Sequence, residues 1–183
     1  MSIYVALLRG VNVGGNNMVS MKDLKAKMSK SGFEDVSTYI NSGNVLFKSD
    51  EKDARRLEKK VEAILAKDFG IENKVVIRSL AEMAKLIKKI DSVWKEQDDW
   101  RYNVMFLRHA VDSKDVVKQF GAKPDIEEVT YTPGTLLWSA PVATIASTTM
   151  QKLSAKPLFK EMTVRNLNTT RKLFSLMQAM ENE

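Results

Sequence analysis

Residues 36–47, VSTYINSGNVLF, decide the fold that this sequence predicts. Val36 to Ile40 is rich in β-branched and aromatic residues, Asn41 to Asn44 has the composition of a tight turn, and Val45 to Phe47 is apolar again. This pattern predicts two antiparallel strands joined by a short turn. A helical pattern lies on each side of the pair, and a further strand lies beyond each helix. The resulting order, strand, helix, strand, strand, helix, strand, is that of the ferredoxin-like plait, an α+β fold.

The elements around this pair have clear boundaries. Ile3 to Leu8 is a compact apolar run and predicts the first strand, and Val75 to Ile77 predicts the fourth. Ser20 is expected to cap the first helix, because a hydroxyl before a helical pattern can accept a free backbone N–H of the first turn. Gly32 is expected to end that helix. An amphipathic pattern over residues 80–90 adds a third helix after the plait.

The second half of the chain repeats this order with matching residues. Four blocks align in the same order along the chain, at elements that correspond. They include Tyr4–Arg9 with Asn103–Arg108, Thr38–Tyr39 with Thr130–Tyr131, Gly43–Phe47 with Gly134–Trp138, and Arg78–Leu86 with Arg165–Leu173. Such repetition indicates an internal duplication. We therefore expect two tandem ferredoxin-like plaits packed together, residues 1–92 and 93–183, each followed by an additional helix.

The composition excludes several kinds of site. The 183-residue chain has no cysteine and a single histidine, His109, which excludes disulfides, thiol nucleophiles and zinc sites built from several histidines. No apolar run approaches the roughly 18 residues of a membrane span. The N-terminus lacks the basic segment of a signal peptide. We expect a cytoplasmic protein with no membrane partner, no metal and no cofactor.

The excess positive charge lies in one half of the chain. The net charge is +6, and residues 1–95 carry 18 Lys and Arg against 12 Asp and Glu, whereas residues 96–183 carry 11 of each. Many of these cations lie in helical patterns, such as residues 52–56, where they usually form a solvated helix face. The alternative is a basic surface that attracts phosphate.

The first copy also contains a loop that the second copy lacks. Thirteen positions separate Arg9 from Lys22, but only six separate the corresponding Arg108 from Lys114. The seven additional residues belong to the glycine- and asparagine-rich segment 10–17. Loops that the fold itself does not need often carry binding.

The topology of the plait brings this loop close to the central turn. In the sheet order 4-1-3-2, the loop after the first strand and the turn between the second and third strands lie at one edge, with the N-terminus of the first helix. Glycines, free backbone N–H groups and an arginine are typical of anion sites. We predict that an anion binds at Arg9, Asn12, Gly14, Gly15, Asn17, Asn41, Ser42, Gly43 and Asn44. The alternative is ordinary turn chemistry, because Asn-Gly and Gly-Gly pairs also favour tight turns.

A second group of polar residues precedes the last helical pattern. Asn166 is expected to cap that helix, and Arg165 either binds a ligand or pairs with an acidic group between the two domains. Both are candidate ligand-binding residues, and for Arg165 we favour the structural role. His109 follows the end of a strand and has no partner suggested by spacing, so we expect an exposed loop histidine and not a catalytic base.

Four motifs spread over almost the whole chain define a family resemblance. They are LRGVNVGG at residues 8–15, Met21-x-x-Leu24 with Gly32-Phe33, the stretch Thr38–Phe47, and Thr163–Leu173 near the end. In these motifs the sequence resembles a widespread bacterial family known only as a domain of unknown function, DUF1697. The resemblance implies a pair of ferredoxin-like plaits, in agreement with the duplication. It implies no established activity, substrate or catalytic residue.

Three classes of function remain open. The first, which we expect, is binding of a phosphorylated or other anionic small molecule at the loop and the turn. The second is nucleic-acid binding, in which Tyr4 and Phe47 would stack with bases on an open sheet face, although no RNA-binding signature is present. The third is an enzyme, for which no pair of residues has a spacing that demands catalysis.

Overall fold

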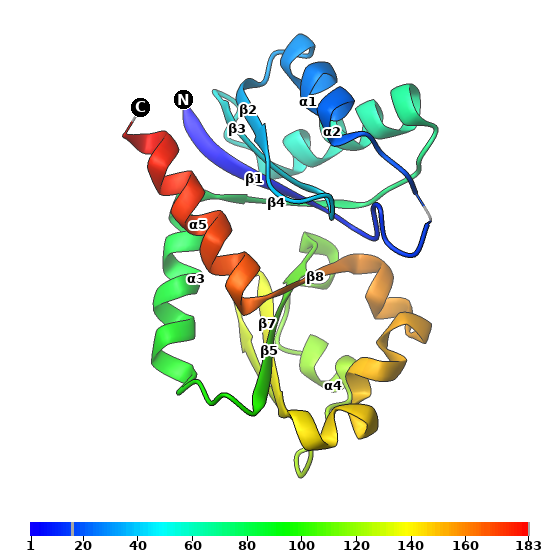
Figure 1. Cartoon of the computed structure of the whole chain (residues 1–183), viewed down its shortest axis with the longest axis vertical. Helices are drawn as coiled ribbons and strands as arrows, with labels where there is room; N and C mark the ends of the chain where they lie inside the picture. Colours follow the sequence, from blue (N-terminus) through cyan, green and yellow to red (C-terminus); the bar gives the residue numbers. More distant parts are fainter. Residues whose placement is uncertain (16, 183) are drawn as a thin grey trace. The chain divides into compact units, whose positions relative to one another are not determined.

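The computed structural model describes residues 1–15 and 17–182 and contains two four-stranded antiparallel sheets (Figure 1). The strand orders are β2-β3-β1-β4 and β6-β7-β5-β8. Each is the order of a ferredoxin-like plait, so the prediction of two tandem plaits in an α+β fold is confirmed. The chain divides into two compact units, residues 1–84 with 172–183 and residues 85–171. The first boundary between these units falls after Ala84, and the chain from Lys172 onward groups with the first unit; the division into residues 1–92 and 93–183 stays a prediction.

The first unit holds the first plait. Its elements are β1 (Ser2–Leu8), α1 (Met21–Lys30), β2 (Glu34–Thr38), β3 (Asn44–Ser49), α2 (Ala54–Phe69), β4 (Val75–Ser79) and the start of α3 (Leu80–Val93). Ser20 caps α1 as predicted, because its hydroxyl accepts the N–H of Asp23 at 3.2 Å. Gly32, with a φ of +83°, follows the last turn and ends the helix as predicted.

The face of the first sheet that α1 and α2 cover carries the core of this unit. Tyr4, Ala6 and Leu8 alternate along β1 on this face and are at most 4% exposed. The ring of Tyr4 stacks on Phe47 with centroids 5.6 Å apart, and Phe33 packs edge-on against Phe47. The hypothesis that Tyr4 and Phe47 stack with nucleic-acid bases is therefore wrong. Both rings are used to fill the space between the sheet and its helices, and neither is exposed to solvent.

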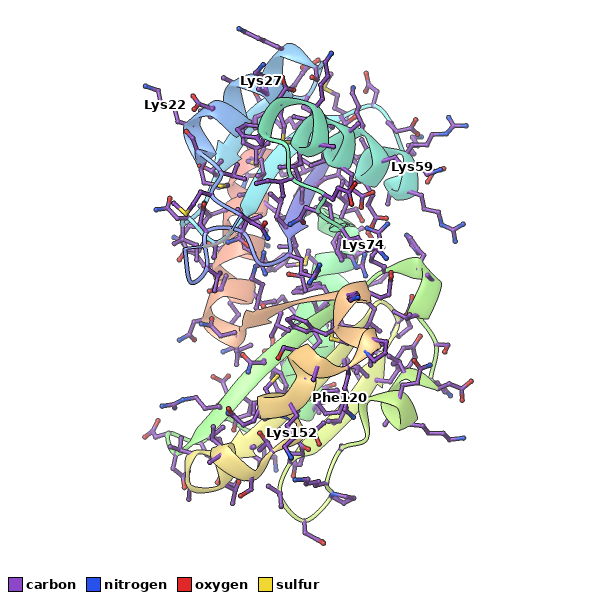
Figure 2. The ribbon with its side chains drawn as sticks, turned by 90° about the vertical axis from the view of Figure 1, so that its right-hand side faces the viewer. Lys22, Lys27, Lys59, Lys74, Phe120 and Lys152 are labelled. Atoms are coloured by element: carbon purple, nitrogen blue, oxygen red, sulfur yellow. The ribbon has the colours of Figure 1, made fainter. Side chains whose placement is uncertain are left out.

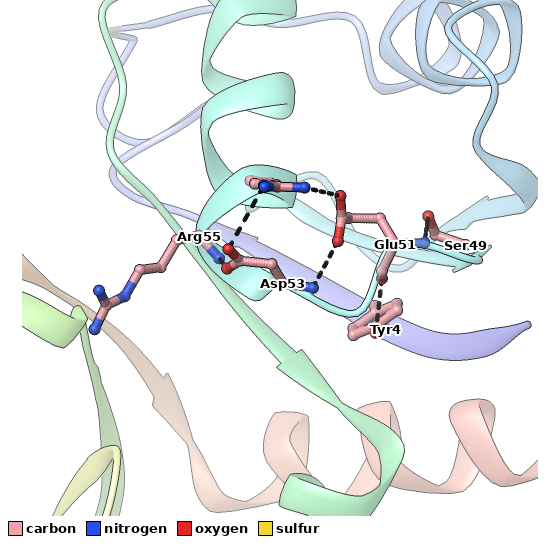
Figure 3. A network of polar contacts seen from close by, with 6 residues as sticks. Tyr4, Ser49, Glu51, Asp53 and Arg55 are labelled. Carbon is pink, nitrogen blue, oxygen red and sulfur yellow. Dashed lines mark hydrogen bonds and ion pairs between the residues drawn. The ribbon is translucent and has the colours of Figure 1, made fainter.

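A network of polar contacts connects β3 to α2 (Figure 3). The hydroxyl of Tyr4 donates to the carbonyl oxygen of Glu51, and the Glu51 carboxylate accepts the N–H of Asp53, both at 2.9 Å. The hydrogen bond from Asp53 outweighs desolvation and, with the Arg56 guanidinium, lowers the pKa of the Glu51 carboxyl. Arg56 lies 3.5 Å from Glu51 and 3.8 Å from Asp53. These ion pairs fit the interpretation of the basic run at residues 52–56 as a solvated helix face.

The second unit holds the second plait, with one difference from the expected order. Its elements are the end of α3, β5 (Trp100–Leu107), η1 (His109–Val111), α4 (Val116–Phe120), β6 (Glu128–Thr132), β7 (Thr135–Pro141), η2 (Val142–Ser147), η3 (Thr149–Ala155), η4 (Pro157–Glu161), β8 (Met162–Asn166) and the start of α5 (Leu167–Glu181). Between β7 and β8 the repeat predicts one α-helix, but the chain forms three short 3-10 helices. The hydroxyls of Thr144 and Thr148 donate to backbone carbonyls three residues earlier, and Pro157 begins η4. Such side-chain bonds and the missing N–H of proline interrupt a continuous helix.

A buried carboxylate fastens this 3-10 segment to the second sheet. Glu127 is 2% exposed. Its carboxylate accepts the indole N–H of Trp138 at 2.6 Å and the backbone N–H groups of Thr149 at 2.9 Å and Lys123 at 3.1 Å. Burial by itself raises the pKa of Glu127, but the hydrogen bonds from Thr149 and Trp138 outweigh it, so the pKa is lowered.

Each of the two copies contains the same hydrogen bond at corresponding residues. In the first copy the N–H of Leu8 donates to the carbonyl oxygen of Gly43 at 2.8 Å. In the second copy the N–H of Leu107 donates to Gly134 at 2.9 Å. These are residues that the sequence alignment pairs, and each bond joins the end of a central strand to the turn between the second and third strands of its plait. The two edges are therefore built in the same way and can be compared residue by residue.

Candidate functional site

The loop and the turn converge at one edge of the first sheet, as the topology predicts. The side-chain amide of Asn12 donates to the carbonyl oxygens of Val19 and Asn41, both at 2.8 Å. Its side-chain oxygen accepts the N–H of Val19 at 2.7 Å. One asparagine therefore holds both ends of the added loop and the turn together. The name loop edge is used below for residues 9–15, 17–19 and 40–44, together with Lys74, which directly precedes β4.

The added loop forms a small hairpin. The N–H of Asn12 donates to the carbonyl oxygen of Asn17 at 3.3 Å, and between them Gly14 and Gly15 have φ values of +60° and +77°. Glycine adopts positive φ values without steric cost, which explains the glycine pair. A Cβ atom at either glycine would meet nothing within 4 Å, so the space beside the turn is open. Asn16, also in the predicted loop, lies outside the described residues.

Three predicted asparagines use their side-chain amides within the protein. Besides Asn12, Asn17 donates to the carbonyl oxygen of Gly10 at 3.3 Å. Asn44 is fully buried and donates to the carbonyl oxygen of Tyr39 at 3.0 Å. These bonds give the three side chains a structural role at the loop edge. A role in ligand binding stays a prediction for each of them.

The other turn residues differ in what they present to solvent. Asn41 is exposed, whereas Ser42 is half-buried and its hydroxyl accepts a bond from Asn44 at 3.4 Å. Gly43 is buried against β1, with a φ of +80° and with the Cβ of Leu8 only 2.7 Å from where its own Cβ would be. The turn therefore packs directly on the end of the central strand.

Replacing Asn12 with alanine is expected to lower the free energy of unfolding by about 2–3 kcal/mol, because three hydrogen bonds are lost. Urea denaturation measures the change. Asn17→Ala is the matched control: Asn17 also has a positive φ, but its side chain makes one long bond at an exposed site. A loss in Asn12→Ala no larger than that in Asn17→Ala would contradict the structural role of Asn12.

A buried asparagine that the sequence did not point to holds the end of β1. The N–H of Arg9 donates to the side-chain oxygen of Asn73 at 3.1 Å, and the Asn73 amide donates to the carbonyl oxygen of Arg9 at 2.6 Å. This side chain continues the pairing of β1 and β4 beyond Leu8 and Val75, their last paired residues. The backbone of Arg9 is therefore fixed, and its half-buried side chain starts from a rigid position.

The two copies carry opposite charge at this end of the sheet. Leu8 pairs with Val75 in the first copy and Leu107 with Met162 in the second, so the residues preceding the two β4-type strands, Lys74 and Glu161, correspond. In the second copy Glu161 lies 3.6 Å from Arg108, the counterpart of Arg9. In the first copy the corresponding position is the exposed Lys74, labelled in Figure 2. A cation thus stands next to the arginine strand end where the second copy has an anion.

The turn shows the same difference in charge. In the second copy the carboxylate of Asp112 accepts the N–H of Gly134 at 2.7 Å and the hydroxyl of Tyr131 at 3.0 Å. Burial and the hydrogen bond to Asp112 raise the pKa of Tyr131. In the first copy the neutral amide of Asn12 holds the turn instead. At these two corresponding positions the first copy has a lysine and a neutral amide, and the carboxylate beside Lys74 is that of Glu62 on α2, which accepts the N–H of Val75 at 2.9 Å.

Arg165 and Asn166 lie in the second unit and have clear local roles. Arg165 is 8% exposed and donates to the hydroxyl of Thr163 and the carbonyl oxygen of Val164, both at 2.8 Å. Its burial lowers the pKa of the guanidinium to about 10. Asn166 accepts the N–H of Thr169 at 2.8 Å, so its predicted role as the cap of α5 is confirmed. Ligand binding by either residue stays a prediction.

His109 is exposed at the start of η1, as expected of a loop histidine. Within residues 1–15 and 17–182, no group of three or more histidine, aspartate or glutamate side chains is arranged to hold a metal ion. The loop edge combines cationic side chains with backbone amides and open space beside the glycine turn. Its described residues contain no set of metal ligands.

The comparisons with known proteins agree with this architecture. The chain is similar in structure to the conserved bacterial protein SP0830 from Streptococcus pneumoniae, with a TM-score of 0.85 and 25% sequence identity over 96% of this chain and 98% of that one. No curated protein matches the sequence. The model of a family described as proteins of unknown function, DUF1697, matches residues 1–138, which include the whole loop edge. The chain therefore belongs to the DUF1697 family.

Proposed function

We propose that the loop edge binds a small molecule that carries a phosphate or another anionic group. The observation that carries the proposal is the difference in charge between the two copies. The first copy has Lys74 where the second has Glu161, and Asn12 where the second uses Asp112 to hold the turn. Because the two edges share one backbone plan, the fold does not require this difference.

The residues of the loop edge have distinct roles in this proposal. Arg9 and Lys74 supply positive charge at the ends of adjacent strands, and the guanidinium of Arg9 suits a planar or tetrahedral anion. The exposed glycine turn, Gly14 and Gly15, lets a ligand approach the backbone closely. Asn12 and the buried Asn44 hold these groups in place through their bonds to the backbone.

Nucleic acid is a less favoured ligand, because the two aromatic rings considered for base stacking, Tyr4 and Phe47, lie in the core.

No helix among the described residues is both long and apolar enough to cross a membrane. A cytoplasmic location stays a prediction from the sequence, and an enzymatic reaction is not part of the proposal.

Calorimetry with pyrophosphate tests the proposal. We expect binding by the wild-type protein and at least tenfold weaker binding by Lys74→Glu, which recreates the charge pattern of the second copy. A charge-assisted contact worth about 1.5–3 kcal/mol corresponds to a factor of about 10 to 150 in Kd. The matched control is Lys59→Glu, which makes the same change of net charge at an exposed site on α2 (Figure 2). No binding by the wild type, or equal weakening in both variants, would contradict the proposal.

A further inference from the structure

The loop edge also displays apolar side chains to solvent. Val13 is 58% exposed, Met18 69% and Ile40 50%. Among the described residues only two other large apolar side chains are exposed, Met1 and Val142. A single exposed apolar residue is ordinary, but several gathered at one place mark a binding surface.

The hydrogen bonds of Asn12 gather these three residues. Its side-chain amide bonds to Val19 and to Asn41. Val13 follows Asn12 in the chain, Met18 precedes Val19, and Ile40 precedes Asn41. Each exposed residue is therefore the chain neighbour of a member of one hydrogen-bonded group. The name apolar rim is used below for the residues Val13, Met18 and Ile40.

Ile40 has a strained backbone conformation and a side chain exposed to solvent. The sequence pattern places Ile40 at the end of the second strand, but β2 ends at Thr38 and Ile40 has a φ of +50°. This left-handed conformation is unfavourable for a β-branched residue. Bonds on both sides maintain it: Tyr39 and Asn44 share two hydrogen bonds, and Asn41 accepts from Asn12. Strain of this kind is typical of functional positions.

We infer that the ligand of the loop edge is an organic phosphate with an apolar or aromatic part, of the class of nucleoside phosphates. This inference rests on the proposed function. Arg9 and Lys74 lie at the ends of β1 and β4, whereas Ile40 lies on the other side, next to the turn that leads into β3. In the order β2-β3-β1-β4, the turn beside β3 lies one strand spacing from the end of β1 and two from β4, ~5–10 Å, a span that a nucleoside phosphate covers and a single phosphate group does not.

The size of the apolar rim favours a small molecule over a protein partner. A stable protein interface buries about 800 Å² on each side, far more than three side chains on a loop and a turn provide. A planar base needs only a few apolar side chains to pack on, and its contact is tolerant of the exact residue types. The charged side of the loop edge would then hold the phosphate, and the apolar rim would hold the base.

The experiment compares pyrophosphate, ribose 5-phosphate and the four ribonucleoside monophosphates by calorimetry. We expect at least one nucleotide to bind 10-fold or more tightly than ribose 5-phosphate. Ile40→Asn removes the apolar side chain and introduces a residue that tolerates the positive φ of this position. In this variant the nucleotide should bind less than threefold more tightly than ribose 5-phosphate. Met18→Ser should also reduce this difference in affinity. Pyrophosphate binding should change in neither variant.

The same Ile40→Asn variant reports on folding independently. Because asparagine tolerates the left-handed conformation, its urea midpoint should be equal to or higher than that of the wild type, so lost affinity cannot be ascribed to unfolding. Val142→Ser removes an exposed apolar side chain from the second unit and should leave every affinity unchanged.

The outcomes separate the two proposals. If pyrophosphate binds and no nucleotide exceeds ribose 5-phosphate, the inference about the apolar rim is wrong and the anion site stands. An unchanged nucleotide advantage in Ile40→Asn would also overturn it. If pyrophosphate does not bind to the wild type, the proposed function itself fails, whether or not a nucleotide binds.

Discussion

Replacing Gly43 with alanine is expected to lower the free energy of unfolding by about 4 kcal/mol. Gly43 has a φ of +80°, which costs an L-residue roughly 1–2 kcal/mol. Its added Cβ would lie 2.7 Å from the Cβ of Leu8 and 3.4 Å from that of Val11. Neither atom is the flexible end of a long side chain, so the backbone of the turn must move away from β1. Overpacking of this kind costs a further 1–3 kcal/mol, approximately.

Gly70→Ala is the matched control for this prediction. Gly70 ends α2 with a φ of +65°, and a Cβ there would meet nothing within 4 Å. Its alanine variant therefore has the conformational cost without the clash, about 1 kcal/mol. Urea denaturation of both variants isolates the contribution of the contact between the turn and β1. Equal losses would show that the turn can separate from the strand without cost. Because the turn is part of the loop edge, Gly43→Ala should also weaken pyrophosphate binding.

Replacing Glu127 with alanine is expected to lower the free energy of unfolding by a similar amount, about 4 kcal/mol. The substitution leaves the indole N–H of Trp138 and the backbone N–H groups of Thr149 and Lys123 without their acceptor in a buried place. A buried donor without a partner costs roughly 1–3 kcal/mol. The neighbouring Glu128, which is exposed, provides the control, and Glu128→Ala should change stability by about 0.5 kcal/mol or less.

The pH dependence of Glu127→Gln gives an independent check. Hydrogen bonding lowers the pKa of Glu127 in the folded protein, so the unfolded chain takes up a proton at this group more readily than the folded one. The contribution of the carboxylate is therefore fully present above the pKa of an unfolded glutamate, about 4.3, and is lost as the pH falls through the lower folded value. The stability difference between wild type and Glu127→Gln should be constant from about pH 5 to 7 and shrink below about pH 4. A difference that grew on acidification would contradict the assignment.

Much of the fold was predictable from particular residues because the interactions are local. Ser20 and Asn166 accept N–H groups three residues ahead, and Gly32 and Gly70 end helices with positive φ values. Each of these features depends on a few adjacent residues and therefore leaves a readable pattern. The duplication was equally readable, because matching residues recur at corresponding elements. The structure agrees, since Leu8 and Leu107 make the same bond, to Gly43 and Gly134.

The candidate site was predictable only in part. The convergence of loop and turn follows from topology, but the inward direction of the amides of Asn12 and Asn44 does not. Asn73 was missed, because a lone asparagine before a strand has no characteristic spacing. The alignment that pairs Arg78 with Arg165 also pairs Lys74 with Glu161, so the difference in charge at this position could be seen in the sequence. Its place beside the strand end became clear only from the Arg108–Glu161 ion pair, which joins residues far apart in the chain.

The order of elements, the duplication, the caps and the glycine turns follow from the sequence, because hydrophobic period, capping and backbone conformation act over a few residues. Three other features depend on how the folded chain packs. Packing placed Tyr4 and Phe47 in the core, replaced a helix in the second copy by 3-10 turns held on Glu127, and strained Ile40 into an exposed position. Tyr4, Phe47 and Ile40 are held by contacts between segments distant in sequence, and those contacts exist only once the sheets have formed. In the 3-10 segment, the long-range bond between Glu127 and Thr149 adds to the local effects of the threonine hydroxyls and Pro157.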